Sequence, residues 1–276
     1  MVFTEASRAI AWKELIDKLR NRWVIIVGLT FMLFTLSIAY LGAAPAGLTG
    51  FRRIDTTVAS LTSLVTFFIP LMSLTLGGGI IAEERERGTL EIFLASPVSA
   101  LEFITGKFLG LLIALTIALV AGLGLAGGML ALKSGIETLW VFARFVFNSL
   151  VLSIIFLSIS FFISIAFYER TKVIALSVFL WLFYTIIYDL GLIGVVLLTK
   201  GEIGMNLFSA LLLLNPVDVY RLMNFISIGE FKIVVGLASV EFSGYINTPI
   251  LLLIALLWTV IPLGGGYLLF KRRYYE

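Results

Sequence analysis

The chain has 276 residues, of which 60% are hydrophobic and 13% are charged, and its mean hydropathy is +1.09. A soluble domain of this length could not bury so much apolar surface, so the composition predicts an integral membrane protein. The net charge of +3 is too small to indicate a nucleic-acid partner. Cysteine and histidine are absent, which excludes disulfides, thiolate or imidazole chemistry and the usual zinc sites. We therefore expect no catalytic residue, no metal site and no bound cofactor in this chain.

The first segment, about residues 4–20, has the pattern of an amphipathic helix. One face carries apolar residues at helical spacing: Trp12, Leu15, Ile16, Leu19 and then Trp23. The other face carries charges: Arg8, Lys13, Glu14, Asp17, Lys18 and Arg20. This pattern predicts a helix that lies on the inner leaflet with its apolar face toward lipid. The alternative is a helix that packs on the protein's own loops.

Six later stretches are long and apolar enough to cross a membrane, which takes about 20 residues. They cover about residues 23–41, 58–82, 107–132, 141–167, 173–199 and 249–270. An even number of spans places both termini on one side. If that side is the cytoplasm, 13 of the 20 Lys and Arg residues lie in inner segments. Because positive charge favours the cytoplasmic side, we expect an inner-membrane protein with both termini inside. No repeat divides the chain, so residues 1–276 form a single transmembrane domain.

The segment at about 203–228, before the last span, is apolar at first but too short to cross the membrane. It is interrupted at Asn215-Pro216, because a residue that precedes proline disfavours helical geometry. Asp218 and Arg221 follow on a plausible second helix. We expect a re-entrant or interfacial hairpin of two short helices at the outer face. The predicted fold is all-α, with six transmembrane helices, an N-terminal interfacial helix and this hairpin.

Two charged residues fall within the predicted spans. Asp189 lies in the fifth span, and Arg144 lies just inside the outer end of the fourth. Because ionised groups in the membrane are usually paired or placed in a wet cavity, we expect an ion pair between them that fixes packing. The alternative is an ion site or gate at Asp189.

Three consecutive glycines, Gly77, Gly78 and Gly79, end the second span. Glycine permits either a bend or a close helix contact. The sequence therefore predicts a hinge or a tight packing site directly before the charged segment that follows.

Residues 83–106 form a charged segment between the second and third spans. A short helix is expected after Gly88, with an apolar ridge at Leu90, Phe93 and Leu94. Such a ridge, flanked by charges, can insert into a groove on a soluble partner, whereas the alternative is a solvated loop that only anchors topology. The residues expected to dock are Glu83, Glu84, Arg85, Glu86, Arg87, Thr89, Leu90, Glu91, Phe93 and Leu94.

The order of residues in this segment resembles a hallmark of type-2 ABC transporter permeases. The resemblance rests on residues 83–91, on 94–99 and on Gly106-Lys107, and the architecture of the whole chain also fits. It implies a homodimer on two copies of a cytoplasmic ATPase that binds ATP and Mg. Gly106-Lys107 is followed by Phe108 and lacks the upstream glycine of a phosphate loop, so nucleotide is bound by another polypeptide.

Residues 19–23, 40–44, 61–67 and 211–222 resemble one branch of this family, the permeases that serve maturation of the copper sites of nitrous oxide reductase. That resemblance implies a further partner, an outer β-helical copper-handling protein, with copper held by other subunits. Three alternatives stay open: a generic type-2 exporter of a lipid, drug or peptide, an ion-coupled secondary transporter that uses Asp189, and a passive scaffold for an outer-face enzyme.

Overall fold

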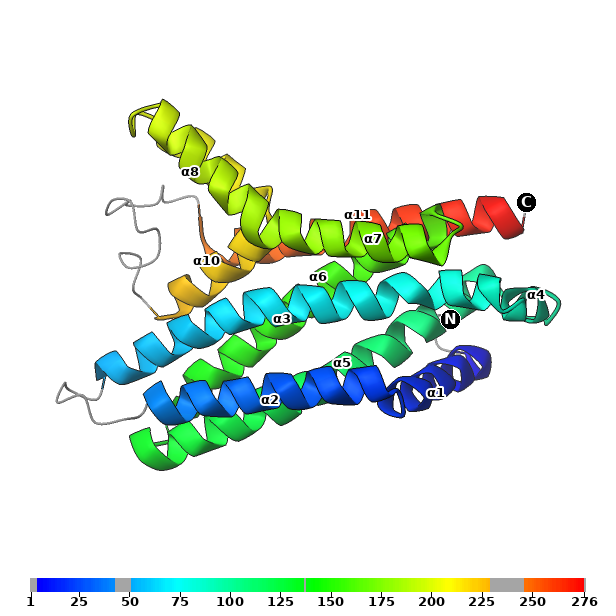
Figure 1. Cartoon of the computed structure of the whole chain (residues 1–276), viewed down its shortest axis with the longest axis horizontal. Coiled ribbons are helices and arrows are strands. Elements are labelled where there is room, and N and C mark those ends of the chain that lie inside the picture. Colours follow the sequence, from blue (N-terminus) through cyan, green and yellow to red (C-terminus); the bar gives the residue numbers. More distant parts are fainter. Residues whose placement is uncertain (1–3, 43–50, 137, 229–245, 276) are drawn as a thin grey trace.

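The computed structural model describes residues 4–42, 51–136, 138–228 and 246–275 (Figure 1). These ranges contain helices and no strand, and six helical segments are long and apolar enough to cross a membrane. The spans are formed by α2 (Arg22–Gly42), α3 (Phe51–Glu86), α5 (Ala100–Ser134), α6 (Thr138–Ala166), the unit of α7 (Arg170–Leu182) with α8 (Tyr188–Leu198), and α11 (Thr248–Tyr274). The predicted all-α membrane fold with six spans is confirmed.

The helices α3 and α6 form the centre of the bundle and are mostly buried, whereas α2, the α7–α8 unit and α11 are mostly exposed at its periphery. Both termini lie at the same end of the bundle, together with α4 (Thr89–Leu94), and we call this the termini end (Figure 1). The opposite end carries α8 and α10 (Pro216–Ile228), and we call it the hairpin end. The predicted hairpin consists of α9 (Met205–Leu213) and α10, with the break at Leu214 and Asn215.

The N-terminal helix α1 (Glu5–Leu19) packs along α5 at the termini end. An added Cβ on Gly110 of α5 would lie 2.6 Å from the Ala11 carbonyl oxygen, so only glycine permits this approach. The buried face of α1 contains Ser7, Ile10, Glu14 and Leu15, while Trp12 is 66% exposed. Of the residues predicted to face lipid, Leu15 is buried, whereas Trp12 and Leu19 are exposed, so contact of this face with lipid stays a prediction. Sequence periodicity does not reveal that a second helix with small residues will cover the side that includes Glu14.

The fifth span changes direction near its middle. Residues Phe183–Ile187 form a π-helical turn between α7 and α8, and α8 points away from the line of α7 (Figure 1). A π-turn loosens the regular hydrogen-bond ladder and is a common cause of a kink. The sequence predicted one uninterrupted span over 173–199, because hydropathy does not detect such a turn.

The three glycines Gly77, Gly78 and Gly79 lie within an unbroken α-helix. An added Cβ on Gly77 would lie 1.9 Å from Ser160 Oγ of α6, and one on Gly78 would lie 2.7 Å from Ser177 Oγ of α7. These two glycines are therefore contact points between α3 and its neighbours, which is the packing alternative. Hinge motion at this site stays a prediction.

We expect Gly77→Ala to lower the thermal unfolding temperature of the purified protein. The added methyl group would also lie 2.9 Å from Leu157 Cδ1, so the Ser160 and Leu157 side chains of α6 must move, and overpacking of this kind costs about 1–3 kcal/mol. Gly79→Ala is the matched control, because its nearest neighbouring atom would be 4.0 Å away. Equal unfolding temperatures for the two variants would contradict the close contact.

Candidate functional site

The charged segment is not a free loop. It forms a corner that consists of the last turn of α3, the short helix α4 and the start of α5. The helix α3 continues through Glu86, so Glu83 to Glu86 belong to its last turn. Gly88, with φ of 68°, then reverses the chain into α4, and the left-handed backbone there favours glycine. The helix α5 starts with a capping box, in which the Ser99 amide donates to Glu102 Oε2 over 2.8 Å. The two long helices thus extend into the predicted coupling segment 83–106, α3 to Glu86 and α5 from Ala100.

The apolar ridge on α4 faces the protein's own core. Leu90 is 3% exposed, and Phe93 and Leu94 pack against the same buried cluster, with the rings of Phe93 and Phe103 5.1 Å apart. The outward face of α4 carries Ile92, which is 70% exposed, and Glu91. Leu90 is therefore not free to insert into a groove on a partner, while docking by the half-buried Phe93 and Leu94 stays a prediction. Helical spacing identifies which residues share a face, but it does not say whether the chain itself covers that face.

A buried ion network lies beneath this corner. Lys107 of α5 is 3% exposed, and its Nζ donates to Glu14 Oε2 of α1 over 2.8 Å and to Glu84 of α3. Thr89 of α4 also donates to the Glu84 carboxylate. Lys18 Nζ lies 3.4 Å from the second oxygen of Glu14, so two bases balance two acids. The network ties four helices together, and each carboxylate has a partner of opposite charge.

Arg85 forms a second interior junction instead of facing a partner. Its Nε donates to the Tyr274 hydroxyl over 2.8 Å, and its Nη1 donates to the Phe167 carbonyl oxygen over 2.9 Å. The guanidinium also lies over the ring of Tyr168, 4.6 Å from its centroid. The Arg273 guanidinium lies 4.3 Å from the same ring centroid. Arg85 therefore joins the end of α3 to the α6–α7 turn and to α11.

The remaining charged residues of the segment lie nearer the surface. Arg87 pairs with Glu83 over 2.5 Å, and its side chain is 68% exposed. Glu86 lies 3.9 Å from Arg170, in a pair that is roughly half exposed on both sides. Exposed pairs of this kind contribute little to stability. The exposed side chains of the corner thus include Glu86, Arg87, Glu91 and Ile92.

A polar cluster occupies the hairpin end, and it includes Asp189. Arg221 Nη1 donates to Asp189 Oδ2 over 2.7 Å and to Asp218 Oδ1 over 2.8 Å. The predicted partner Arg144 is wrong: it is exposed on α6, whereas α10 folds back and brings Arg221 against the fifth span. Burial raises the pKa of Asp218 to about 6, an effect that Arg221 opposes and Asp189 reinforces.

Asn215 connects the hairpin to the π-turn of the fifth span. Its Nδ2 donates to the Tyr184 carbonyl oxygen over 3.0 Å and to Asp218 Oδ2 over 2.9 Å, and its Oδ1 accepts from the Val217 amide over 3.0 Å. Pro216 opens α10, where a missing N–H costs nothing. The predicted hairpin residues Asn215, Pro216, Asp218 and Arg221 therefore belong to one site.

Sequence reasoning missed several polar contacts at the hairpin end. Tyr188 donates to the Leu211 carbonyl oxygen over 2.6 Å, and Asn148 of α6 donates to Asn224 of α10 over 2.9 Å. Ser149 Oγ lies 3.1 Å from the Tyr220 hydroxyl. The available signal was the density of amide and hydroxyl groups in α10 and early α6. Within the described ranges, no group of three or more acidic side chains is arranged to hold a metal ion.

The chain has six spans, a corner of packed helices at the termini end and a hairpin before the last span. This architecture is that of a helical membrane subunit of the permease type. Residues 8–274 match the family model described as "ABC-2 family transporter protein", so the chain belongs to this family. Two relatives are both named "Probable ABC transporter permease protein NosY". The one from Stutzerimonas stutzeri is 36% identical over 268 residues, and the one from Pseudomonas aeruginosa PAO1 is 38% identical over 268 residues. Each alignment covers 96% of this chain and 97% of the relative.

We expect Lys107→Ala to destabilise the protein strongly. Removal of the base leaves Glu84 without its ion-pair partner and leaves Glu14 with Lys18 alone, and breaking a buried pair costs about 3–5 kcal/mol. Lys172→Ala is the matched control, because its pair with Glu169 has side chains that are 64% and 63% exposed. Thermal unfolding of both purified variants measures the difference. Similar unfolding temperatures would show that the Lys107 network adds nothing to stability.

We expect Asp189 to couple energetically with Arg221 and not with Arg144. In double-mutant cycles, Asp189→Asn and Arg221→Gln should be non-additive by about 0.5–3 kcal/mol, since the two side chains are in contact. Asp189→Asn and Arg144→Gln should be additive. The readout is the unfolding temperature of the singles and doubles. Coupling at Arg144 in place of Arg221 would refute the observed pairing.

Proposed function

We propose that this chain is the permease subunit of an ABC complex in the inner membrane, where it couples ATP hydrolysis by a separate cytoplasmic ATPase to an event at the outer face. The observation that carries the proposal is the family match over residues 8–274. The corner formed by α3, α4 and α5 at the termini end supplies a surface on which such an ATPase can dock.

The orientation in this proposal follows from the distribution of positive charge. The segments at the termini end hold 13 of the 20 Lys and Arg residues. The positive-inside rule therefore favours a cytoplasmic termini end and an outward hairpin end. In this orientation α4 lies in the cytoplasm, and the Arg221 cluster lies toward the outer face.

In this proposal some residues of the charged segment contact the ATPase, and the others hold α4 against the rest of the protein. The ATPase contacts Ile92 and Glu91, while Leu90 beneath them and the Lys107 network tie α4 to α1, α3 and α5. A displacement of α4 is then carried into several spans at once. Two copies of the chain would sit on two copies of the ATPase, which holds the ATP and Mg.

The finer role that we propose for the outer-face event is maturation of the copper sites of nitrous oxide reductase. Identities of 36% and 38% over nearly the full length to permeases named NosY support it. The chain lacks His and Cys, so copper would be held by other subunits, among them an outer copper-handling protein. A generic export function for a lipid, drug or peptide is the second candidate within the same family.

One observation disfavours the ion-coupled transporter. Asp189 already accepts a hydrogen bond from Arg221 over 2.7 Å. The guanidinium of Arg221 already lies where a transported cation would contact the Asp189 carboxylate.

We expect Ile92→Asp to release the ATPase. In a native-membrane purification of the tagged chain, the ATPase should no longer copurify, and nitrous oxide reductase from the same cells should lose its copper. An apolar contact replaced by a charge is costly at a packed interface. The matched control is Ile136→Asp, since Ile136 is 78% exposed in the connection between α5 and α6, at the hairpin end.

The possible outcomes distinguish the role in copper-site maturation from the docking of the ATPase on α4. Loss of the ATPase with fully loaded reductase would contradict the copper role and leave the generic exporter. An unchanged ATPase yield from Ile92→Asp would refute docking on α4.

A further inference from the structure

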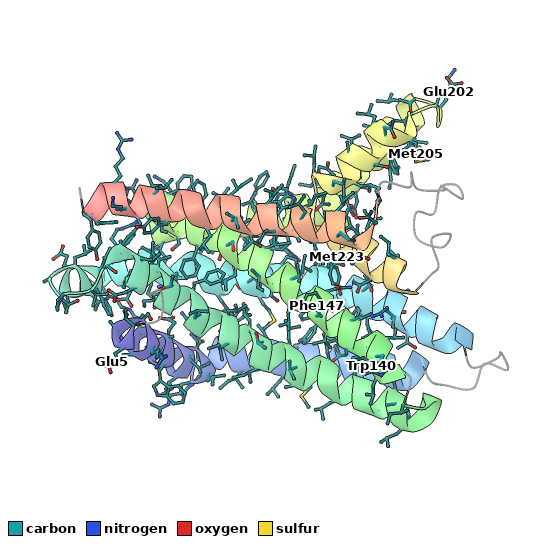
Figure 2. All side chains as sticks on the ribbon, turned by 180° about the vertical axis from the view of Figure 1, so that it is seen from behind. Glu5, Trp140, Phe147, Glu202, Met205 and Met223 are labelled. Carbon is teal, nitrogen blue, oxygen red and sulfur yellow. The ribbon has the colours of Figure 1, made fainter. Side chains whose placement is uncertain are left out.

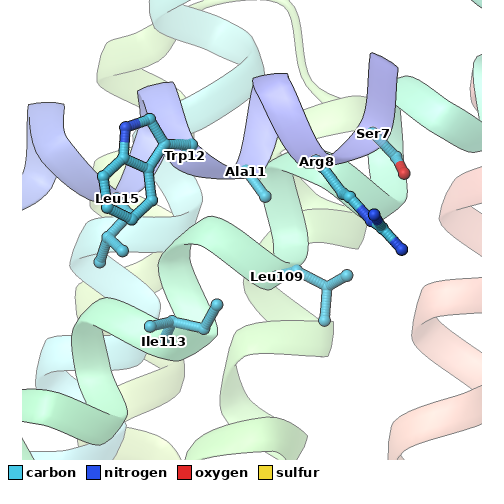
Figure 3. A pocket seen from close by; sticks show the side chains of 7 residues that line it. All are labelled: Ser7, Arg8, Ala11, Trp12, Leu15, Leu109 and Ile113. Carbon is cyan, nitrogen blue, oxygen red and sulfur yellow. The ribbon is translucent and has the colours of Figure 1, made fainter. Parts of the chain in front are cut away.

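A groove of about 280 Å³ runs between α1 and α5 at the termini end (Figure 3). Its walls are Ala11, Trp12 and Leu15 of α1 and Leu109 and Ile113 of α5, and Arg8 lies at one end. The volume is near the lower limit of small-molecule sites, about 300 Å³. It suits part of an extended hydrocarbon chain better than a complete drug-sized ligand.

The groove opens toward the outside of the bundle. Trp12 is 66% exposed and Ile113 is 43% exposed, so the walls are not closed by another helix of this chain in the described residues. The helix α5 is a membrane span, and Ile113 lies about 20 Å along it from Ala100 at a rise of about 1.5 Å per residue. Ile113 therefore lies within the span, where an acyl chain of the bilayer can reach it.

Polarity changes along the groove in the same sense as across a lipid monolayer. Arg8 lies beside Leu109, nearer the start of α5, whereas Trp12 and Leu15 lie beside Ile113, four residues further along the span (Figure 3). The Arg8 side chain is exposed and makes no ion pair with the residues described by the structure. Tryptophan favours the boundary between headgroups and acyl chains, and arginine binds phosphate through paired N–H groups.

We propose that this groove binds an anionic phospholipid of the inner leaflet, with an acyl chain along Leu109 and Ile113 and its phosphate on Arg8. The proposal rests on the orientation given above, in which the termini end faces the cytoplasm, and not on ATPase docking or copper. Arg8 supplies selectivity for negative charge, because a basic residue near an anionic membrane surface interacts favourably with it.

The bound lipid would act on the same helix contact as the ion network. Ala11 approaches Gly110 on one side of α1, and Glu14 of the same helix reaches Lys107. A chain seated between α1 and α5 therefore fills the open side of this contact. The lipid completes the packing of α1 where the protein leaves it unfilled.

The test is native mass spectrometry of the purified full chain, titrated separately with phosphatidylglycerol and phosphatidylcholine of the same chain length. We expect tighter binding of phosphatidylglycerol, and we expect Arg8→Ala to weaken that binding about fivefold with little effect on phosphatidylcholine. The matched control is Arg20→Ala, because Arg20 is exposed at the other end of α1 and does not line the groove.

A second pair of variants tests the acyl-chain site independently. Ile113→Trp should fill the groove and reduce binding of both lipids, while Ile117→Trp should not, because Ile117 is 45% exposed one turn further along α5 and lies outside the groove. Equal affinity for the two lipids, equal effects of Arg8→Ala and Arg20→Ala, or unchanged binding in Ile113→Trp would each overturn the proposal. None of these readouts involves the ATPase or copper, so failure here leaves the proposed function untouched.

Discussion

The packing of the helices at the termini end depends on the buried amine of Lys107. Lys107 lies in the span α5, which begins at Ala100, and is 3% exposed, and a charge in such a place is tolerated only when it is paired. Its two acidic partners, Glu14 and Glu84, come from helices that are remote in sequence. The protein can therefore satisfy Lys107 only when α1, α3 and α5 are all in place. The positions of α4 and of the groove beside α1 follow from this requirement.

The pairing of Lys107 also explains why part of the charged segment faces the interior of the protein. Its sequence is rich in acids and bases, which suggested a docking surface, but Glu84 and Arg85 are engaged by residues of the chain itself. The contact that we propose for the ATPase is a small face around Ile92. A small contact on a rigid corner transmits displacement better than a large contact on a flexible loop, because packed helices move as units and loops absorb motion.

The features that the sequence predicted correctly are local ones. Span positions follow from continuous hydropathy, and the hairpin break at Asn215 follows from the proline after it. The wrong predictions concern which residues contact each other in the folded chain. Asp189 pairs with Arg221 and not Arg144, and Leu90 of the α4 ridge turns inward, because both outcomes depend on how helices far apart in sequence fold against each other. The π-turn at Phe183–Ile187 also has no hydropathy signal.

The two ends of the molecule are connected through the contact between α3 and α7. Near the termini end Gly78 lets Ser177 approach the α3 backbone, and further along the Trp181 indole N–H donates to the Phe67 carbonyl oxygen over 2.9 Å. Just beyond Trp181 the π-turn presents the Tyr184 carbonyl oxygen to Asn215 of the hairpin. A shift of α3 relative to α6 would therefore carry α7 with it and reach the Arg221 cluster through Asn215. In the coupling that we propose, the route from one end to the other is a packed helix pair that ends in a hydrogen bond, and it needs no continuous line of charged residues.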